Sequence, residues 1–391
     1  MARSTADDSR KTQAAPFCTR SFLGDRSRDL FVSAVPASAH DDDRTQFTSM
    51  AARALAALES QGLSPFNLVC GYVYLTRTPV WDWRAVLAQA FGASGPLPIT
   101  ALVQPPVLPN QFCAMQLHAI HAARQSGVWH GNVAEPAAAT VLRHGARHLR
   151  LMSITPRRGL PARAAFDDLA YDMFAQAGHA LAARGLTFRD VVRTWIYVQD
   201  IEHNYAAINR IRRRYFAENQ LLRLPASTCV GGILPGAPVP VSMDLYAVAT
   251  GSEVRIEAIT PGDMCEASEY GSAFARGSRI VEPGRTTLYL SGTASIDAAG
   301  AVVAAGDITG QLGRMFDNVR ALLDGSGFAM PHVLSVTTYL KHASHRRAYA
   351  KAAAAAGLPA DLPQVVVVAD ICRPEWLCEL ELCAARAEPH G

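Results

Sequence analysis

One pattern of apolar and polar positions occurs three times along the chain. In each copy, apolar residues at helical spacing are followed by a glycine, a short turn and a strand rich in aromatic and β-branched residues. The glycines are Gly62, Gly185 and Gly327, and the strands after them include Tyr72-Val73-Tyr74-Leu75, Thr194-Trp195-Ile196-Tyr197-Val198 and Thr337-Thr338-Tyr339-Leu340. A glycine at this place is typical of a helix end. A period above about 100 residues is too long for a solenoid and predicts three copies of a small domain.

The other elements of each copy recur around this anchor. Each copy opens with an apolar strand, at 30–34, 150–154 and 288–292, and has a second helix near 83–91, 204–216 and 345–356. A proline-led apolar segment and a closing strand, at 115–120, 243–248 and 378–383, complete the unit. Two helices on one face of a mixed sheet predict an α+β fold. We therefore expect a disordered leader over 1–27 and three units over 28–125, 126–252 and 253–391.

Composition excludes several classes of partner. The formal net charge of +3 is too small to predict nucleic acid or an anionic membrane as a partner. The one dense basic run, Arg212-Arg213-Arg214, is interpreted as a solvated helix face. No segment predicts a membrane span, and the polar N-terminus lacks the apolar region of a secretory signal. The eight cysteines form no C-x-x-C pair, which favours reduced thiols and a cytoplasmic protein.

The chain lacks the common cofactor motifs. It contains no G-x-G-x-x-G, phosphate-binding loop, G-x-S-x-G or H-E-x-x-H sequence. His118 and His121 are close in sequence, but no Cys or carboxylate pattern joins them into a metal site. We therefore expect chemistry without a cofactor or a metal.

The closing strands carry the candidate chemistry. Residues at i and i+2 of a strand share a face, and only the third copy presents two carboxylates there, Glu379 and Glu381. Two like charges in a partly closed cleft cannot both ionise cheaply, so one carboxyl would keep a raised pKa and act as a proton donor. The alternative is a pair of solvated glutamates on an edge strand.

The repeated unit resembles the RidA/YjgF family over residues 28–387. The resemblance is strongest in the third copy, in Tyr270-Gly271-Ser272-Ala273-Phe274-Ala275-Arg276-Gly277, Leu290-Ser291-Gly292-Thr293-Ala294 and Asp370-Ile371-Cys372-Arg373-Pro374-Glu375-Trp376-Leu377-Cys378-Glu379-Leu380-Glu381. Members of that family are homotrimers with ligand sites between subunits. A single chain with three copies resembles the chorismatases. The resemblance implies a pseudo-trimer with a central barrel-like core, which acts as a monomer or a small homo-oligomer.

The resemblance also implies a reaction. Chorismate would be the small-molecule substrate, and Glu379 would protonate its enolpyruvyl methylene so that pyruvate can leave. Because the substrate has two carboxylates, we expect arginine contacts from among Arg147, Arg276 and Arg373. Tyr246 could donate a hydroxyl, and Glu381 lies beside the acid. Each of these residues also has an ordinary structural interpretation, as an ion pair or a packed aromatic.

Two further residues bear on the product in the resemblance. Gly277 and Cys372 occupy positions where hydroxybenzoate-forming members have Gly and Cys and hydrolysing members have Ala and Val. They favour 3-hydroxybenzoate, with some 4-hydroxybenzoate, over the dihydroxycyclohexadiene carboxylate that hydrolysis would give. Without the resemblance, Cys372 is an ordinary buried thiol.

Two rival functions remain open at this point. A RidA-type deaminase of enamines and imines needs an arginine in a P-A-R-S segment, and Pro98-Ile99-Thr100, Pro225-Ala226-Ser227 and Pro363-Gln364-Val365 supply none. A non-catalytic metabolite-binding protein is the second rival, because a fold does not fix a function.

Overall fold

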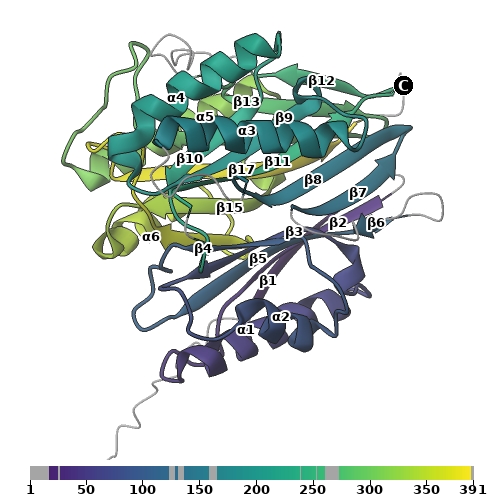
Figure 1. Cartoon of the computed structure of the whole chain (residues 1–391). Helices are drawn as coiled ribbons and strands as arrows, with labels where there is room; N and C mark the ends of the chain where they lie inside the picture. Colours follow the sequence, from purple (N-terminus) through teal and green to yellow (C-terminus); the bar gives the residue numbers. More distant parts are fainter. Residues whose placement is uncertain are drawn as a thin grey trace, which may run out of the picture.

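The computed structural model describes residues 17–24, 27–122, 128–130, 136–157, 165–237, 239–251, 253–259 and 273–388. In this part the chain forms three mixed sheets with helices packed against them (Figure 1). The predicted leader up to residue 16 lies outside the described residues, as do Cys265 and Tyr270-Gly271-Ser272 of the third copy.

The first sheet has the strand order β1-β2-β5-β3-β4. Its strands and helices are β1 (Phe17–Leu23), β2 (Ser27–Ala34), α1 (Asp43–Glu59), β3 (Leu68–Leu75), α2 (Trp83–Phe91), β4 (Ile99–Val103) and β5 (Cys113–Ala122). The aromatic strand β3 pairs antiparallel with the closing strand β5 and parallel with β4. A parallel edge strand beside an antiparallel core makes the sheet mixed, as predicted.

The second and third sheets repeat this plan and extend it. The second, in the order β10-β9-β11-β8-β7-β6, comprises β6 (Val128–His130), β7 (Ala137–Arg143), β8 (Ala146–Ile154), α3 (Phe166–Ala182), β9 (Val191–Val198), α4 (Ile201–Glu218), β10 (Ala226–Gly231) and β11 (Val241–Ala249). The third, in the order β12-β13-β14-β17-β15-β16, comprises β12 (Arg255–Ala258), β13 (Gly277–Glu282), β14 (Arg285–Ala294), α5 (Ile308–Gly325), β15 (Val333–Leu340), α6 (Arg346–Ala355), β16 (Gln364–Val368) and β17 (Cys378–Ala387).

The repeated glycines end the first helix of each unit as predicted. Gly62, Gly185 and Gly327 have φ of 69°, 66° and 75°, a left-handed conformation that glycine adopts without a steric penalty. The amide after each glycine then bonds back into the last helical turn: Leu63 N to Leu58 O at 3.0 Å, Leu186 N to Leu181 O at 3.0 Å, and Phe328 N to Leu323 O at 2.8 Å. This is the Schellman arrangement, and it turns the chain into the aromatic strand.

Additional strands lie outside the predicted elements. The expectation of a disordered leader through residue 27 is wrong for Phe17–Leu23, which pairs with β2 along its whole length. Phe17 and Phe22 explain this order, because they pack into the hydrophobic clusters on opposite faces of the first sheet. β6 and β7 extend the second sheet, and β12 and β13 extend the third.

The three sheets contact one another through their inner faces. Their outer faces pack under the helices, whereas the inner faces share one buried cluster that includes Tyr72, Trp195 and Tyr289 from the three sheets. Backbone hydrogen bonds after the parallel edge strands also link the units in a cycle: Val103 N to Ile233 O at 2.9 Å, Gly231 N to Asp370 O at 2.8 Å, and Val368 N to Pro105 O at 2.7 Å. No helix in the described part of the chain is long and apolar enough to cross a membrane.

Candidate active site

The two glutamates of the third closing strand are buried. β17 lies between β14 and β15, and Glu379 and Glu381 are 4% and 8% exposed. They share the inner face of the sheet because alternate residues of a strand point to the same side. The interpretation of these residues as solvated glutamates on an edge strand is therefore wrong.

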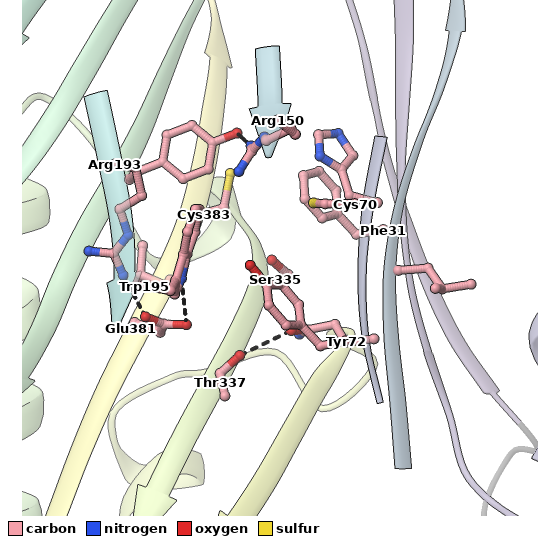
Figure 2. A pocket seen from close by; sticks show the side chains of 15 residues that line it. Phe31, Cys70, Tyr72, Arg150, Arg193, Trp195, Ser335, Thr337, Glu381 and Cys383 are labelled. Atoms are coloured by element: carbon pink, nitrogen blue, oxygen red, sulfur yellow. Dashed lines mark hydrogen bonds and ion pairs between the residues drawn. The ribbon is translucent and has the colours of Figure 1, made fainter. Parts of the chain in front are cut away.

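Glu381 is held by hydrogen-bond donors from two units. Its Oε2 accepts from Arg193 Nη2 at 2.5 Å and from the Thr228 hydroxyl. Its Oε1 accepts from Trp195 Nε1 at 3.1 Å and from the Tyr339 hydroxyl at 3.2 Å. Figure 2 shows the Arg193 and Trp195 contacts. A donor-rich shell with a charged guanidinium suits a carboxylate anion.

Glu379 has the opposite environment. Burial raises its pKa to about 8, and the neighbouring charge of Glu381 adds to the increase, while Arg193 and Arg276 oppose it. At neutral pH the Glu379 carboxyl therefore retains its proton. The two carboxyls therefore differ in their environments, and the assignment of Glu379 as a proton donor stays a prediction.

A glycine makes room for the acid. A Cβ atom built on Gly292 of β14 would lie 1.7 Å from Glu379 Oε1, so the carboxyl occupies the space that any other side chain would fill. The Gly292 amide donates to the Thr228 hydroxyl at 3.0 Å, which fixes this backbone against the neighbouring unit. Gly292 is therefore required by the close approach of Glu379.

Replacing Gly292 with alanine is expected to displace the Glu379 carboxyl. The rate of a reaction in which Glu379 donates the proton would then fall. The new methyl group would overlap the carboxyl, and a shift of about 1 Å in a catalytic group can cost about a hundredfold in rate. The matched control is Gly313→Ala in α5, where a Cβ atom meets nothing within 4 Å. Equal activity of the two purified variants would contradict the assigned role of Gly292.

The ionisation of Glu379 also predicts a pH-dependent stability difference. Its pKa is about 8 in the folded chain and ordinarily 4.5. Between these values the unfolded state loses the proton that the folded state keeps, so the contribution of Glu379 to stability falls by about 1.4 kcal/mol per pH unit. Relative to wild type, Glu379→Gln should therefore gain stability as the pH rises from 4.5 to 8. Thermal melts across this range test it, and a difference independent of pH would contradict it.

Three buried arginines lie in this region, and two of them, Arg193 and Arg276, act electrostatically on Glu379. Arg193, Arg212 and Arg276 are 1%, 1% and 3% exposed. Arg212 donates to Asn209 Oδ1 at 2.5 Å and to Ser227 Oγ at 3.2 Å, and its Nε has no partner. Arg212 and Arg276 both lie over the Phe274 ring, at 5.2 and 5.8 Å.

Arg212 is the least compensated of these cations. Its hydrogen-bond partners in the described part of the chain are neutral, although a buried guanidinium normally has an anionic partner. Burial raises the pKa of the Cys229 thiol to about 12; Arg212 opposes this increase, whereas Glu379 contributes to it. Arg212 and Glu379 therefore act electrostatically on the same thiol, although the cations that shift the pKa of Glu379 itself are Arg193 and Arg276.

The basic run was misinterpreted in the sequence. Arg213 and Arg214 are exposed as predicted, but Arg212 is buried. Successive residues of a helix point about 100° apart, so one residue of a triplet can face the core while the others face solvent. Arg212 lies one helical turn from the buried Ile208 and Phe216, a spacing that could have identified it.

Two predicted site residues of the third unit lie on the loop before β17. Cys372 is buried, and its pKa is raised well above the ordinary value by burial and then by Glu379. This electrostatic interaction brings Cys372 into the surroundings of the acid. Arg373 donates to Gly300 O at 2.7 Å and lies 4.8 Å from the Trp376 ring. These contacts join Arg373 to the loop after β14.

Gly277 has a packing role. A Cβ atom there would lie 3.0 Å from Leu290 Cδ2 and Tyr289 O, and 3.1 Å from Ile259 Cγ1. The expectation that this glycine leaves room beside a substrate ring stays a prediction. The glycine allows close packing of strands within the third unit.

Arg147 and Tyr246 are not brought to Glu379. Arg147 lies on the helix side of β8, where its Nη2 is 3.7 Å from a Cβ built on Gly185 at the end of α3. The prediction failed because the inner face of this strand is formed by the alternate residues, including Arg150. Tyr246 does lie on an inner face, but its hydroxyl is bonded to His148 Nδ1 at 2.6 Å and Arg150 covers its ring at 3.8 Å.

No metal site is found among the residues that the structure describes. His118, the histidine considered above, is buried and bonded to Asp29 Oδ1 at 2.8 Å, and it stacks on Phe31. The sequence interpretation missed Arg193, Arg212 and Gly292. Of these, Arg193 could have been noticed as a charged residue within an otherwise apolar, aromatic strand.

The fold and the repeated unit define a protein family. Residues 154–249 and 272–386 match the endoribonuclease L-PSP family, and the chain belongs to this RidA/YjgF-like family. A RutC family protein of Haemophilus influenzae is 31% identical over 97 residues, which cover 23% of this chain and 72% of that protein. The prediction of a RidA/YjgF-like family is confirmed for these residues.

One solved structure resembles most of the chain. It is described as a chorismatase crystal structure at 1.08 Å resolution, and its TM-score is 0.60. The match covers 82% of this chain and 93% of that one, at 19% sequence identity. At this identity the likeness shows the fold, which is mixed α+β with repeated RidA-like units.

Proposed function

We propose that this protein is a chorismatase that converts chorismate into pyruvate and a hydroxybenzoate. The observation that carries the proposal is Glu379, a buried carboxyl with a pKa of about 8 beside the anionic Glu381. Such a group is protonated at neutral pH and can act as a general acid. The likeness to the chorismatase fold over most of the chain supports the same choice.

Proton donation by Glu379 would start the reaction. The proton goes to the terminal methylene carbon of the enolpyruvyl ether, which leaves an oxocarbenium ion, and the weakened ether bond then breaks to release pyruvate. The remaining ring loses a proton and rearranges to the aromatic acid, so hydroxybenzoate and pyruvate together have the composition of chorismate. General acid catalysis of this kind contributes about 10²- to 10⁴-fold.

The buried arginines would hold the substrate carboxylates. Arg193, Arg212 and Arg276 are buried, and in the described part of the chain the hydrogen-bond partners of Arg212 are neutral. A substrate carboxylate would compensate the charge of Arg212 in a buried setting, where charge-assisted hydrogen bonds are strong. Arg373 is a further candidate from the sequence, although its contact with Gly300 O orients it toward that loop.

The product type is proposed from Cys372. If its thiol assists the collapse to 3-hydroxybenzoate, Cys372→Val should shift the product toward 4-hydroxybenzoate or the dihydroxycyclohexadiene carboxylate, because valine offers no polarizable proton donor. Chromatography of the products measures the ratio. Cys229→Val, at another buried thiol near the acid, is the control. An unchanged ratio in Cys372→Val would assign the selectivity to other residues.

Imine or enamine deamination is the second candidate, and Arg212 favours it. The sequence lacks the P-A-R-S arginine, and Ser227 occupies its position after Pro225-Ala226. Arg212 Nη1 of α4 lies 3.2 Å from Ser227 Oγ, so a helix residue places a guanidinium next to this position. Purified protein incubated with chorismate should release pyruvate and a hydroxybenzoate; ammonia release from 2-aminoacrylate, without conversion of chorismate, would select the deaminase instead.

The cyclic contacts of the units accord with a pseudo-trimer, which we propose as the overall arrangement, with the shared inner cluster as its barrel-like core. In this arrangement the proposed site lies at the junction of the second and third units. Thr228 on β10 and Gly292 on β14 come from these two units, and both contact the Glu379–Glu381 pair. The units would then share a single catalytic acid, because Ala114 and Ser242 occupy the positions equivalent to Glu379. They pair with Tyr74 and Tyr197 as Glu379 pairs with Tyr339.

A further inference from the structure

A small cavity lies where the inner faces of the three sheets meet (Figure 2). Its wall includes Tyr72 from the first sheet, Arg150 and Arg193 from the second, and Tyr289 from the third. The cavity offers about 60 Å³ to solvent. Since one water needs about 10–15 Å³ by such a measure, it accommodates about four to six non-hydrogen atoms. A molecule of the size of chorismate does not fit there.

Arg150 is a buried cation without an anionic partner in this cavity. It is 5% exposed, and its Nη2 donates to the Tyr289 hydroxyl at 2.7 Å. Its guanidinium is otherwise surrounded by aromatic rings, with centroids at 3.8 Å for Tyr246, 5.2 Å for Tyr289 and 5.4 Å for Trp195. No hydrogen bond or ion pair joins it to a carboxylate in the described residues. Glu381 is paired with Arg193 and Asp29 with Arg285. The Oδ1 of Asp244 accepts from neutral donors, its Oδ2 has no hydrogen-bond partner, and the charge of Arg150 opposes the increase that burial causes in the Asp244 pKa.

Other donors around the same cavity also lack acceptors. The Tyr72 hydroxyl is buried and has no hydrogen-bond partner, and the same holds for Nε and Nη1 of Arg193. The side-chain amide of Gln116 has other partners: its nitrogen donates to Val336 O, and its oxygen accepts from the Thr337 hydroxyl. Leaving buried polar groups unpaired costs about 1–3 kcal/mol each, and more for charged groups. Arg150 and Tyr72 thus leave positive charge and donor capacity unused on one wall.

We infer that the central cavity binds a short-chain monocarboxylate of two or three carbons. Its carboxylate would accept from Arg150 and the Tyr72 hydroxyl, and its carbon end would contact the apolar side of the wall at Phe31, Cys70 and Cys383. The size of the cavity excludes aromatic acids, and the excess of donors favours an anion over a neutral molecule. This site depends on Arg150 and Tyr72. Its wall shares Arg193 and Glu381 with the proposed reaction site, and changes at Arg150 or Tyr72 leave both of these residues in place.

The test uses the full-length protein with acetate as the probe and acetamide as its neutral analogue. Sodium acetate, compared with sodium chloride at equal ionic strength, should raise the melting temperature in proportion to the logarithm of its concentration, whereas acetamide should not. Calorimetry should show affinity for acetate weakened at least about tenfold in Arg150→Met and in Tyr72→Phe. Arg210→Met, at an exposed ion pair with Asp167, should bind like wild type.

Tyr72→Phe keeps the test decisive if Arg150→Met does not fold, because it removes a single oxygen atom from an already unpaired group. Equal responses to acetate and acetamide, or undiminished acetate binding in Tyr72→Phe, would overturn the inference. So would a crystal structure grown in acetate that shows only water beside Arg150. Benzoate binding that depends on Arg150 would refute the size limit.

Discussion

Glutamine at position 379 is expected to abolish pyruvate release from chorismate while the protein stays folded. The amide has nearly the same shape as the protonated carboxyl but cannot transfer the proton to the methylene carbon. Loss of a general acid typically costs about 10²- to 10⁴-fold. The measurement is a coupled assay of pyruvate, with chorismate binding followed separately by calorimetry. Since the pKa of Glu379 is about 8, wild-type activity should also fall as the pH rises above 8 and the acid ionises.

Glu381→Gln is the matched comparison, and its phenotype should be the reverse. Glu381 accepts hydrogen bonds from Arg193, Trp195 and Tyr339. Removing its charge leaves Arg193 uncompensated, and breaking a buried ion pair costs about 3–5 kcal/mol. We expect Glu381→Gln to lower stability strongly and to keep part of the activity. Full activity in Glu379→Gln, or loss confined to Glu381→Gln, would show that the acid was assigned to the wrong member of the pair.

The units were predictable because their elements are set by local signals. The helix-ending glycines at Gly62, Gly185 and Gly327 and the aromatic strands after them follow from backbone conformation and side-chain alternation within a few residues. The same alternation placed Glu379 and Glu381 on one face. β1 was missed because its sequence has no strong β pattern of its own and gains its order by pairing with β2.

The rest of the site depends on contacts between units, which no local pattern reports. Thr228 reaches Glu381 across 153 positions of sequence, and Gly292 matters only because Glu379 fills the space beside it. Arg147 was an expected contact, but it lies on the helix side of β8. Residue type alone does not show which face of a strand an arginine occupies. Arg212 was interpreted as exposed, like Arg213 and Arg214, because residue type alone does not show the face of a helix either.

Removing the Arg212 charge should therefore separate binding from stability. A buried guanidinium with neutral partners is costly to keep in the folded protein, so Arg212→Met should maintain or raise the melting temperature without substrate. The same change removes a charge-assisted contact to a substrate carboxylate, and we expect kcat/KM for chorismate to fall by about 10²-fold or more. Melting curves and steady-state kinetics on one preparation measure both effects.

The adjacent residue supplies the control for this prediction. Arg213 carries the same charge on the same helix but faces solvent, so Arg213→Met should leave kcat/KM within about twofold of wild type, as surface changes usually do. If both variants lost activity equally, the effect would be one of net charge. If Arg212→Met instead lowered the melting temperature strongly while the folded protein kept its affinity for chorismate, Arg212 would be a structural cation. The carboxylate contacts would then be assigned to Arg193 and Arg276. A stable Arg212→Met that has lost its affinity for chorismate would mean that the buried charge is kept, at a cost in stability, for an anion from outside the chain.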